Sequence, residues 1–351
     1  MSEENKIQFI FLRHGQSTLN SKNLFCGWID PPLTDIGIEQ AKTAASEIHK
    51  HLQKTNNIDL PAVSFCSRLT RTKQTLLTIL NELNELKNKN SNKKNNLGFS
   101  ENVIIEKHNP LLFKDVNINP AMKDSGYNFY ESWRLNERHY GSWQGQNKKK
   151  IQYIVGDNEY MRIRRDYQGK PPNVNLSHEM EQPNKNSNSD DNDMQDNNDS
   201  VKEIKKDESS VEYEFKEPNR LLKYNIEYQF GDLDLPISES LSDVLTRITP
   251  LLHSFIVPKV VESDNKTGMI IAHGSSIRAI LMILCGLNED EIKGVNIPNG
   301  MPMVIELTYT KHKRHGSNDN QAYDLTLNDR YYLDPELAKQ KAEQVKMEGR
   351  N

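Results

Sequence analysis

Residues 7–27, IQFIFLRHGQSTLNSKNLFCG, decide the fold that we predict for this chain. Their apolar start, Ile7 to Leu12, has the length and the Ile and Phe content of a buried β-strand. The strand ends at Arg13 and His14, and a glycine and polar residues then open a loop or a helix. In an open α/β sheet, ligands bind beyond the carboxyl ends of the strands. We therefore predict that His14, on a rigid strand end beside the charge of Arg13, is a nucleophile directed at a phosphate.

Two later apolar runs end in the same way. Ala62 to Ser67 leads into Arg68 and Arg71 at the start of a helical segment, and Gly268 to Ala272 leads into His273. Arginine at a helix start can face an anion together with the backbone N–H groups. Because the carboxyl ends of parallel strands meet at one edge of a sheet, we expect the three junctions to converge there.

Strands and helices alternate along the chain, which favours an α/β fold: a three-layer α/β/α sandwich with a mainly parallel sheet. Apolar residues recur at helical spacing in residues 34–51, 70–80, 239–261 and 277–286, and residues 303–308 form a last predicted strand. The predicted organisation is a single domain over residues 1–351.

Two segments interrupt this predicted domain. Residues 84–126 are rich in Asn and Lys, and residues 175–212 consist of Asn, Ser, Asp and Glu with almost no aliphatic side chains. Such compositions bury too little apolar surface to offset the entropy of the chain. We predict a flexible surface insert for the first segment, with a small strand at 103–107, and disorder for the second. The Lys- and Glu-rich end from Leu333 is predicted to be a helix or a frayed segment, with a flexible tail from about residue 337.

Composition narrows the partners and the compartment. The 45 Lys and Arg residues against 49 Asp and Glu residues, a formal net charge of −4, disfavour nucleic acid or an anionic membrane as a partner. The three cysteines show no CxxC spacing, which argues against a disulfide framework or a zinc site. We find no signal-peptide pattern after Met1 and no run of about 18 apolar residues. We expect a cytoplasmic protein without a metal site.

Further motifs extend the pattern along the chain. Besides LRHGQS and NLFCGW (12–28), they are SRLTRTKQT (67–75), WRLNERHYG (133–141), the pair at 164–165, ESL (239–241), IIAHGSSIRA (270–279), IPNGMP (297–302) and YYLDPE (331–336). A lone RHG is a weak signal, whereas the ordered set is specific. On these motifs the chain resembles the cofactor-dependent phosphoglycerate mutases of the histidine phosphatase superfamily, over nearly its whole length outside the two inserts.

The resemblance implies an enzyme that interconverts 3-phosphoglycerate and 2-phosphoglycerate through a phosphohistidine at His14. It also implies priming by 2,3-bisphosphoglycerate, a small phosphorylated carboxylate as substrate, and no metal. Arg13, Arg71 and His273 would surround the transferring phosphoryl group, and Glu137 would be the general acid and base. The implied substrate-binding positions are Ser17, Asn20, Cys26, Gly27, Tyr140, Lys148, Arg164, Arg165, Gly274 and Ser275.

The chemistry of these side chains agrees with the implied roles. Phosphoryl transfer needs an in-line nucleophile and positive charge around the equatorial oxygens. A neutral imidazole is nucleophilic near pH 7, provided that its other nitrogen donates a hydrogen bond that fixes the tautomer. The carboxyl of Glu137 can exchange a proton in both directions of a mutase reaction. Lys148, Arg164 and Arg165 suit a phosphate and a carboxylate.

Three departures from the family pattern keep alternatives open. Cys26 replaces the usual Thr or Ser, Thr18 and Leu19 replace Glu-Trp, and Ser275 replaces Asn. With the inserts, they leave open a divergent paralogue with little or no turnover that serves binding or regulation. A phosphatase or bisphosphoglycerate mutase of the same superfamily is the second alternative. The family often forms dimers or tetramers, so a homo-oligomer is open as well.

Overall fold

The strands form one sheet in the computed structural model, which describes residues 5–91, 117–120, 128–174, 235–313 and 321–347. They are β1 (Lys6–Arg13), β2 (Val63–Cys66), β3 (Asn117–Pro120), β4 (Asn128–Glu131), β5 (Thr267–Ala272), β6 (Met303–Lys313) and β7 (Gln321–Tyr332). The described strands lie in the order β3-β4-β2-β5-β1-β6-β7. The central strands β4, β2, β5 and β1 pair in parallel, and β3, β6 and β7 add antiparallel edges. The parallel part of the predicted sheet is thus its centre.

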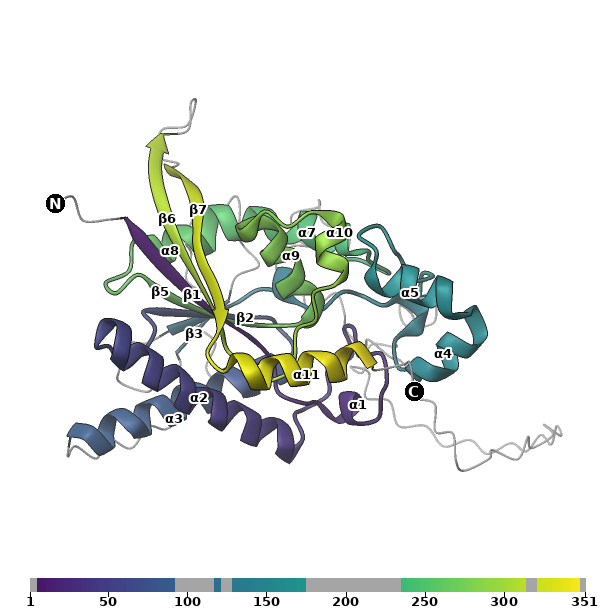
Figure 1. Ribbon diagram of the computed structural model, residues 1–351, viewed down its shortest axis with the longest axis horizontal. Helices are drawn as coiled ribbons and strands as arrows, with labels where there is room; N and C mark the ends of the chain where they lie inside the picture. The colour runs from purple at the N-terminus through teal and green to yellow at the C-terminus, as the bar shows by residue number, and fades with distance from the viewer. Residues whose placement is uncertain (1–4, 92–116, 121–127, 175–234, 314–320, 348–351) are drawn as a thin grey trace, which may run out of the picture.

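Helices cover both faces of this sheet, which confirms the predicted α/β sandwich (Figure 1). On one side lie α2 (Asp35–Asn56), α3 (Thr70–Ser91) and α11 (Pro335–Met347), and on the other α7 (Leu241–Leu251), α8 (Val257–Val261) and α9 (Gly274–Cys285). The remaining described α-helices are α1 (Thr18–Ser21), α4 (Lys148–Val155), α5 (Asp157–Arg165) and α10 (Glu289–Lys293). Helices α4 and α5 stand together beyond one end of the sheet (Figure 1).

Strand β1 is buried on both faces, which explains its apolar run from Phe9 to Leu12. Side chains alternate along a strand. Phe9 and Phe11 therefore pack into the cluster on the side of α7–α9, and Ile10 and Leu12 into the cluster formed with α2 and α3. All four side chains are at most 1% exposed. A strand in this position reads as a continuous apolar run rather than as an alternating one.

One helical stretch, Leu241–Val261, is by length and composition apolar enough to cross a membrane, and it is the one such stretch in the described part of the chain. Its side chains Val244, Ile248, Ile256 and Val260 are fully buried in the cluster that covers the sheet. The position of the helix in the core accounts for its apolar composition.

The prediction of a flexible insert over residues 84–126 was wrong in two places. Helix α3 runs on to Ser91, past the expected start of the insert near 84, because Leu80 and Leu83 are fully buried against α2 and Lys87 pairs with Asp59 at 3.6 Å. Strand β3 also falls within the segment predicted as the first insert. The predicted strand at 103–107 and the segment 175–212 lie outside the described residues, so both stay predictions.

Helix α11 confirms the helix alternative for the end of the chain, whereas the predicted flexible tail from 337 was wrong. The carboxylate of Asp334 accepts the N–H of Leu337 at 3.0 Å and caps the helix. Ala338 is 1% exposed, and Lys341 reaches the sulfur of Met301. A helix that buries one narrow face keeps a charged composition elsewhere, which is why the sequence suggests a tail. Strand β7 was not expected either.

Two glycines let the N-terminus of α2 approach the turn after β1. A Cβ on Gly15 would lie 2.2 Å from the carbonyl oxygen of Gly37, and a Cβ on Gly37 would lie 2.2 Å from the carbonyl oxygen of Gln16. Both obstacles are backbone atoms, which cannot move without displacing the turn. The close approach therefore explains a glycine in the first turn of a helix, where it costs helix stability.

We predict that Gly37→Ala destabilises the protein by about 1–3 kcal/mol, because overpacking outweighs the roughly 1 kcal/mol that alanine contributes to helix stability. Gly294→Ala is the matched control. Its backbone is helical, and an added Cβ would have its nearest neighbour at 3.8 Å. Urea unfolding of both variants provides the measurement. A Gly37→Ala protein as stable as the wild type would contradict the steric argument.

Candidate active site

The expected convergence of the three strand ends is confirmed. Strands β2, β5 and β1 are parallel neighbours, so the residues after them meet at one edge of the sheet. The ring centroids of His14 and His273 are 4.9 Å apart. The Nε of Arg71, in the first turn of α3, lies 3.2 Å from the Nε2 of His14. These three side chains form the floor of the candidate site.

His14 is held in one tautomer from both sides of its ring. Its Nδ1 lies 2.7 Å from the carbonyl oxygen of Gly15, which can only accept, so Nδ1 carries the proton. Nε2 therefore carries a lone pair and accepts the N–H of Arg71. Burial, reinforced by Arg71 and Arg13, lowers the pKa of His14 well below its ordinary value. The ring is neutral at pH 7 and presents a nucleophilic nitrogen.

Arg71 and Arg13 are fixed by backbone carbonyls. The fully buried Arg71 donates to the carbonyls of Ile29 and Gly27, each at 2.8 Å. Arg13 donates to the carbonyl of Ile297, also at 2.8 Å. Carbonyl acceptors set the direction of a guanidinium without neutralising its charge. The two cations therefore remain able to bind an anion beside His14.

His273 lies fully buried beside His14. Its Nε2 is 2.8 Å from the hydroxyl of Ser67. Burial, together with Arg71 and His14, lowers its pKa well below the ordinary value. Two neutral rings side by side avoid the repulsion that two imidazolium ions would suffer next to two arginines.

Glu137 stands at the edge of the cavity above this floor and is 8% exposed. Its Oε1 accepts the backbone N–H groups of Arg138, at 2.8 Å, and of Ser275 in the first turn of α9, at 3.1 Å. Its Oε2 lies 3.7 Å from the position that a Cβ on Gly274 would take. One carboxylate oxygen is thus anchored, and the other faces the start of α9.

The outer wall of the cavity is strongly positive. Lys148, Arg164 and Arg165 line it together with Arg278 of α9. Burial, with the neighbouring Arg165 and Arg138, lowers the pKa of Arg278 to about 9, which leaves the side chain charged at pH 7. This excess of cations predicts a ligand with more than one anionic group.

Tyr140 lies within the same positive wall. Its hydroxyl is buried, which opposes ionisation, but Arg138 and Arg164 outweigh this effect and lower the pKa of Tyr140. The guanidinium carbon of Arg138 is 4.7 Å from the centre of the Tyr140 ring. Val345, near the end of α11, completes the rim of the cavity.

The structure brings nearly all the sequence-predicted site residues to this one cavity. Its lining includes Arg13, His14, Asn20, Cys26, Gly27, Arg71, Glu137, Tyr140, Lys148, Arg164, Arg165, Gly274 and Ser275. His273 lies beneath it. Cys26 belongs to the lining, and its sulfur accepts an N–H of Asn20 at 3.3 Å.

Ser17 is the exception among the predicted ligand-binding residues, since it is fully buried and does not line the cavity. Its hydroxyl donates to the side-chain oxygen of Asn20 at 2.9 Å and accepts the N–H of the same residue. Ser17 is thus the cap of helix α1, and it acts on the cavity by fixing Asn20.

Sequence reasoning missed two residues near the site. Arg278 lies within the quoted motif IIAHGSSIRA and lines the cavity, but it was not predicted as a site residue. The signal that could have identified it is a charged residue within an otherwise apolar helix. Trp28 donates its indole N–H to the carbonyl of Glu137 at 2.7 Å. No pattern in the sequence signals that contact, because it joins positions 109 residues apart.

Comparison with known proteins identifies the family. The histidine phosphatase superfamily (branch 1) matches residues 9–93. The chain is 40% identical over 345 residues to phosphoglycerate mutase 2 of Saccharomyces cerevisiae, covering 98% of this chain and 96% of that protein. This chain belongs to the phosphoglycerate mutase family.

Two further relatives agree with this family. Phosphoglycerate mutase 3 of Saccharomyces cerevisiae is 40% identical over 358 residues, covering 99% of this chain and 98% of that protein. A 2,3-bisphosphoglycerate-dependent phosphoglycerate mutase of Bifidobacterium longum is 29% identical over 344 residues, covering 97% and 98%. The phosphoglycerate mutase family also fits the composition of the cavity, where a histidine and cations dominate. In the described residues no group of three or more His, Cys, Asp or Glu side chains could hold a metal ion.

We predict that the buried histidines make the fold acid-sensitive. The unfolded chain binds a proton at each histidine near pH 6.5, whereas His14 and His273 have lower pKa values in the fold. Stability from these groups is therefore present above pH 6.5 and lost as the pH falls below it. Two such groups give a slope of up to about 2.7 kcal/mol per pH unit.

Urea unfolding between pH 5 and 7 measures this slope. His273→Gln is expected to reduce it by up to about half. The control is His312→Gln, since the His312 ring lies on the surface, 3.3 Å from Asp324 and away from the site. Equal slopes for the wild type and His273→Gln would contradict the prediction.

Proposed function

We propose that this protein is a phosphoglycerate mutase that interconverts 3-phosphoglycerate and 2-phosphoglycerate through a phosphohistidine at His14. The observation that carries the proposal is the neutral His14 ring, whose Nε2 lone pair faces Arg71 in a cationic cavity that Arg13 also lines. The identity of 40% to two yeast phosphoglycerate mutases supports the same activity.

The first chemical step is attack by the Nε2 of His14 on a phosphorus of 2,3-bisphosphoglycerate, which leaves a phosphohistidine and a monophosphoglycerate. The N–P bond forms while the P–O bond breaks, and Glu137 gives its proton to the departing oxygen. The ring acquires a positive charge, which the Nδ1–H hydrogen bond to the Gly15 carbonyl stabilises. Arg13 and Arg71 bind the equatorial oxygens of the phosphoryl group.

The second step reverses the first at the neighbouring carbon of an incoming 3-phosphoglycerate, whose 2-hydroxyl receives the phosphoryl group. Glu137, now a carboxylate, takes the proton of the other hydroxyl, whose oxygen attacks phosphorus while the N–P electron pair returns to Nε2. One carboxyl thus acts in both directions. Its two backbone N–H bonds at Oε1 leave Oε2 as the oxygen that exchanges the proton.

The outer wall binds the parts of the substrate that do not react. Lys148, Arg164 and Arg165 are placed to hold a carboxylate and a phosphate, and Asn20 and Tyr140 complete the cradle. The paired cationic regions of the cavity also fit 2,3-bisphosphoglycerate, which supplies the phosphoryl group that primes His14. We further propose a cytoplasmic location, in keeping with a glycolytic reaction on a small metabolite.

The first test of this proposal is labelling with radioactive 2,3-bisphosphoglycerate, followed by turnover of 3-phosphoglycerate. We expect the wild type to form an acid-labile phosphoenzyme and to produce 2-phosphoglycerate. His14→Ala should abolish labelling and reduce turnover by at least about 10³-fold, and His312→Ala, a surface control, should change neither.

Two other outcomes would contradict the proposal. Label that passes only to free phosphate would identify a phosphatase. A folded protein that takes up no label would favour the paralogue that serves binding or regulation.

We predict that Cys26→Ser increases kcat/KM for 3-phosphoglycerate by about two- to tenfold, the value of one hydrogen bond. A thiol is a weak donor to an anion, whereas a hydroxyl in the same place donates well. The control is Cys285→Ser, since Cys285 is half-buried and outside the cavity. Unchanged kinetics for Cys26→Ser would show that the thiol does not limit activity.

A further inference from the structure

A buried ion pair lies next to the site without lining its cavity. Arg247 of α7 places its Nε 2.6 Å from Oε1 of Glu239, and its Nη2 3.1 Å from Oε2 of the same residue. The two side chains are 6% and 3% exposed. The motif ESL at 239–241 was part of the family resemblance, yet the proposed function gives its glutamate no role.

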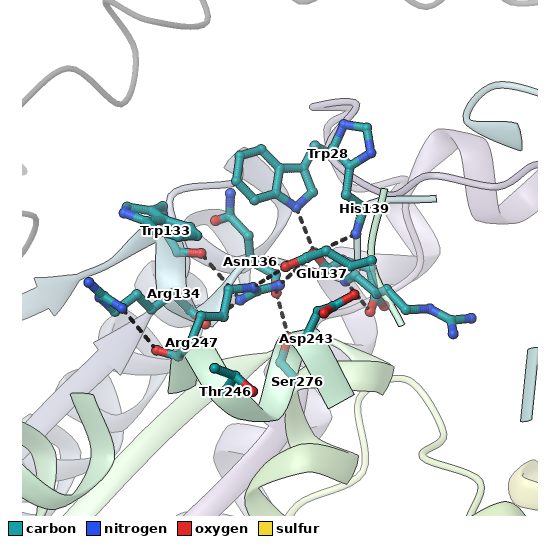
Figure 2. A network of polar contacts seen from close by, with 12 residues as sticks. Trp28, Trp133, Arg134, Asn136, Glu137, His139, Asp243, Thr246, Arg247 and Ser276 are labelled. Atoms are coloured by element: carbon teal, nitrogen blue, oxygen red, sulfur yellow. Dashed lines mark hydrogen bonds and ion pairs between the residues drawn. The ribbon is translucent and has the colours of Figure 1, made fainter. Parts of the chain in front are cut away.

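The remaining N–H groups of Arg247 all point at one short segment of backbone (Figure 2). Nη2 donates to the carbonyls of Asn136, at 2.9 Å, and of Glu137, at 3.0 Å. Nη1 donates to the carbonyls of Arg134 and, at 3.5 Å, of Trp133. The guanidinium thus gathers four carbonyls from the segment that ends at Glu137.

The partner of Arg247 holds the same segment on its other side. Oε2 of Glu239 accepts the N–H of His139 at 2.8 Å, and the N–H of Glu239 donates to the carbonyl of His139 at 2.9 Å. Ser276 of α9 adds a hydrogen bond of 2.6 Å to the carbonyl of Asn136. The residues on both sides of Glu137 are therefore fixed from α7 and α9.

Glu137 itself is held at both ends. Its carbonyl oxygen accepts from Arg247 and from the indole of Trp28, and its carboxylate accepts the two backbone N–H groups described above. We infer that Arg247, neutralised by Glu239, is a positioning residue that sets where the carboxyl of Glu137 meets the reacting oxygen. The inference rests on the proposed role of Glu137 as general acid and base.

An arginine is suited to this task because its planar fork offers five N–H donors in fixed directions. A lysine at 247 keeps the charge opposite Glu239 but cannot hold four carbonyls at once. A displacement of about 1 Å in a catalytic group can cost about 100-fold in rate. The expected defect of Arg247→Lys is therefore catalytic, with its folded structure retained.

The choice of leaving group separates positioning from a merely structural role. An alkyl phosphate needs a proton from Glu137 when its oxygen departs, whereas p-nitrophenolate leaves as a stable anion without one. A displaced Glu137 therefore slows phosphorylation of the protein by 2,3-bisphosphoglycerate and spares its phosphorylation by p-nitrophenyl phosphate. A general loss of structure at the site slows both reactions equally.

The experiment measures single-turnover phosphorylation of Arg247→Lys by 2,3-bisphosphoglycerate and, from the release of p-nitrophenolate, by p-nitrophenyl phosphate. The matched control is Arg162→Lys, because Arg162 forms an ion pair of the same 2.6 Å with Glu159 on the surface. We expect Arg247→Lys to slow the alkyl reaction by about 10- to 100-fold and the aryl reaction by less than about twofold. The control should change neither.

A double variant tests whether the effect passes through Glu137. In a Glu137→Gln background, Arg247→Lys should cause no further loss in the alkyl reaction, because the group that it positions is already absent. Additive losses, or equal losses on both substrates, would overturn the inference. A wild type that is phosphorylated but makes no 2-phosphoglycerate would refute the mutase proposal alone, since the ratio of alkyl to aryl rates still reports the position of Glu137.

Discussion

The hydrogen bond from the Nδ1–H of His14 to the carbonyl of Gly15 is the contact on which the chemistry of this protein depends. It places the lone pair on Nε2, and the buried arginines beside it keep the ring unprotonated. Charges that make His14 a poor base for protons also attract the phosphate that it attacks. The approach of α2 fixes the turn that provides this carbonyl, and Gly15 in the turn and Gly37 in the helix permit that approach.

The site combines two ways of handling buried charge. Arg13 and Arg71 are oriented by carbonyls and keep their charge for a ligand. Arg247, which is buried next to the cavity without lining it, is neutralised by Glu239, and its N–H groups donate to backbone carbonyls instead. An unpaired cation at position 247 would compete for the substrate, so the ion pair confines the anion-binding field to the cavity.

The sequence predicted most of the strand ends and most of the cavity, because local signals mark both. An apolar run that stops at a basic residue or histidine, as at Leu12 or Ala272, identifies a buried strand and the residue that it delivers. Contacts that depend on packing between distant segments could not be found in this way. Three contacts belong to that class: the capping of helix α1 by Ser17, the hydrogen bond of the Trp28 indole, and the hydrogen bonds of Arg247 to four carbonyls. The sequence left a helix and a frayed segment open for the end of the chain, because a helix with one narrow buried face has the composition of a tail.

The arrangement of the chain's ends has a practical consequence. Strand β1 begins at the edge of the sheet opposite the cavity, whereas α11 brings Val345 to its rim. An affinity tag or a fluorescent fusion attached after α11 starts beside the mouth of the cavity and competes for the space through which a metabolite enters. A tag or fusion attached before β1 lies on the side of the molecule away from α4 and α5 (Figure 1). A fusion partner that is meant to leave activity intact should therefore be joined at the N-terminal end.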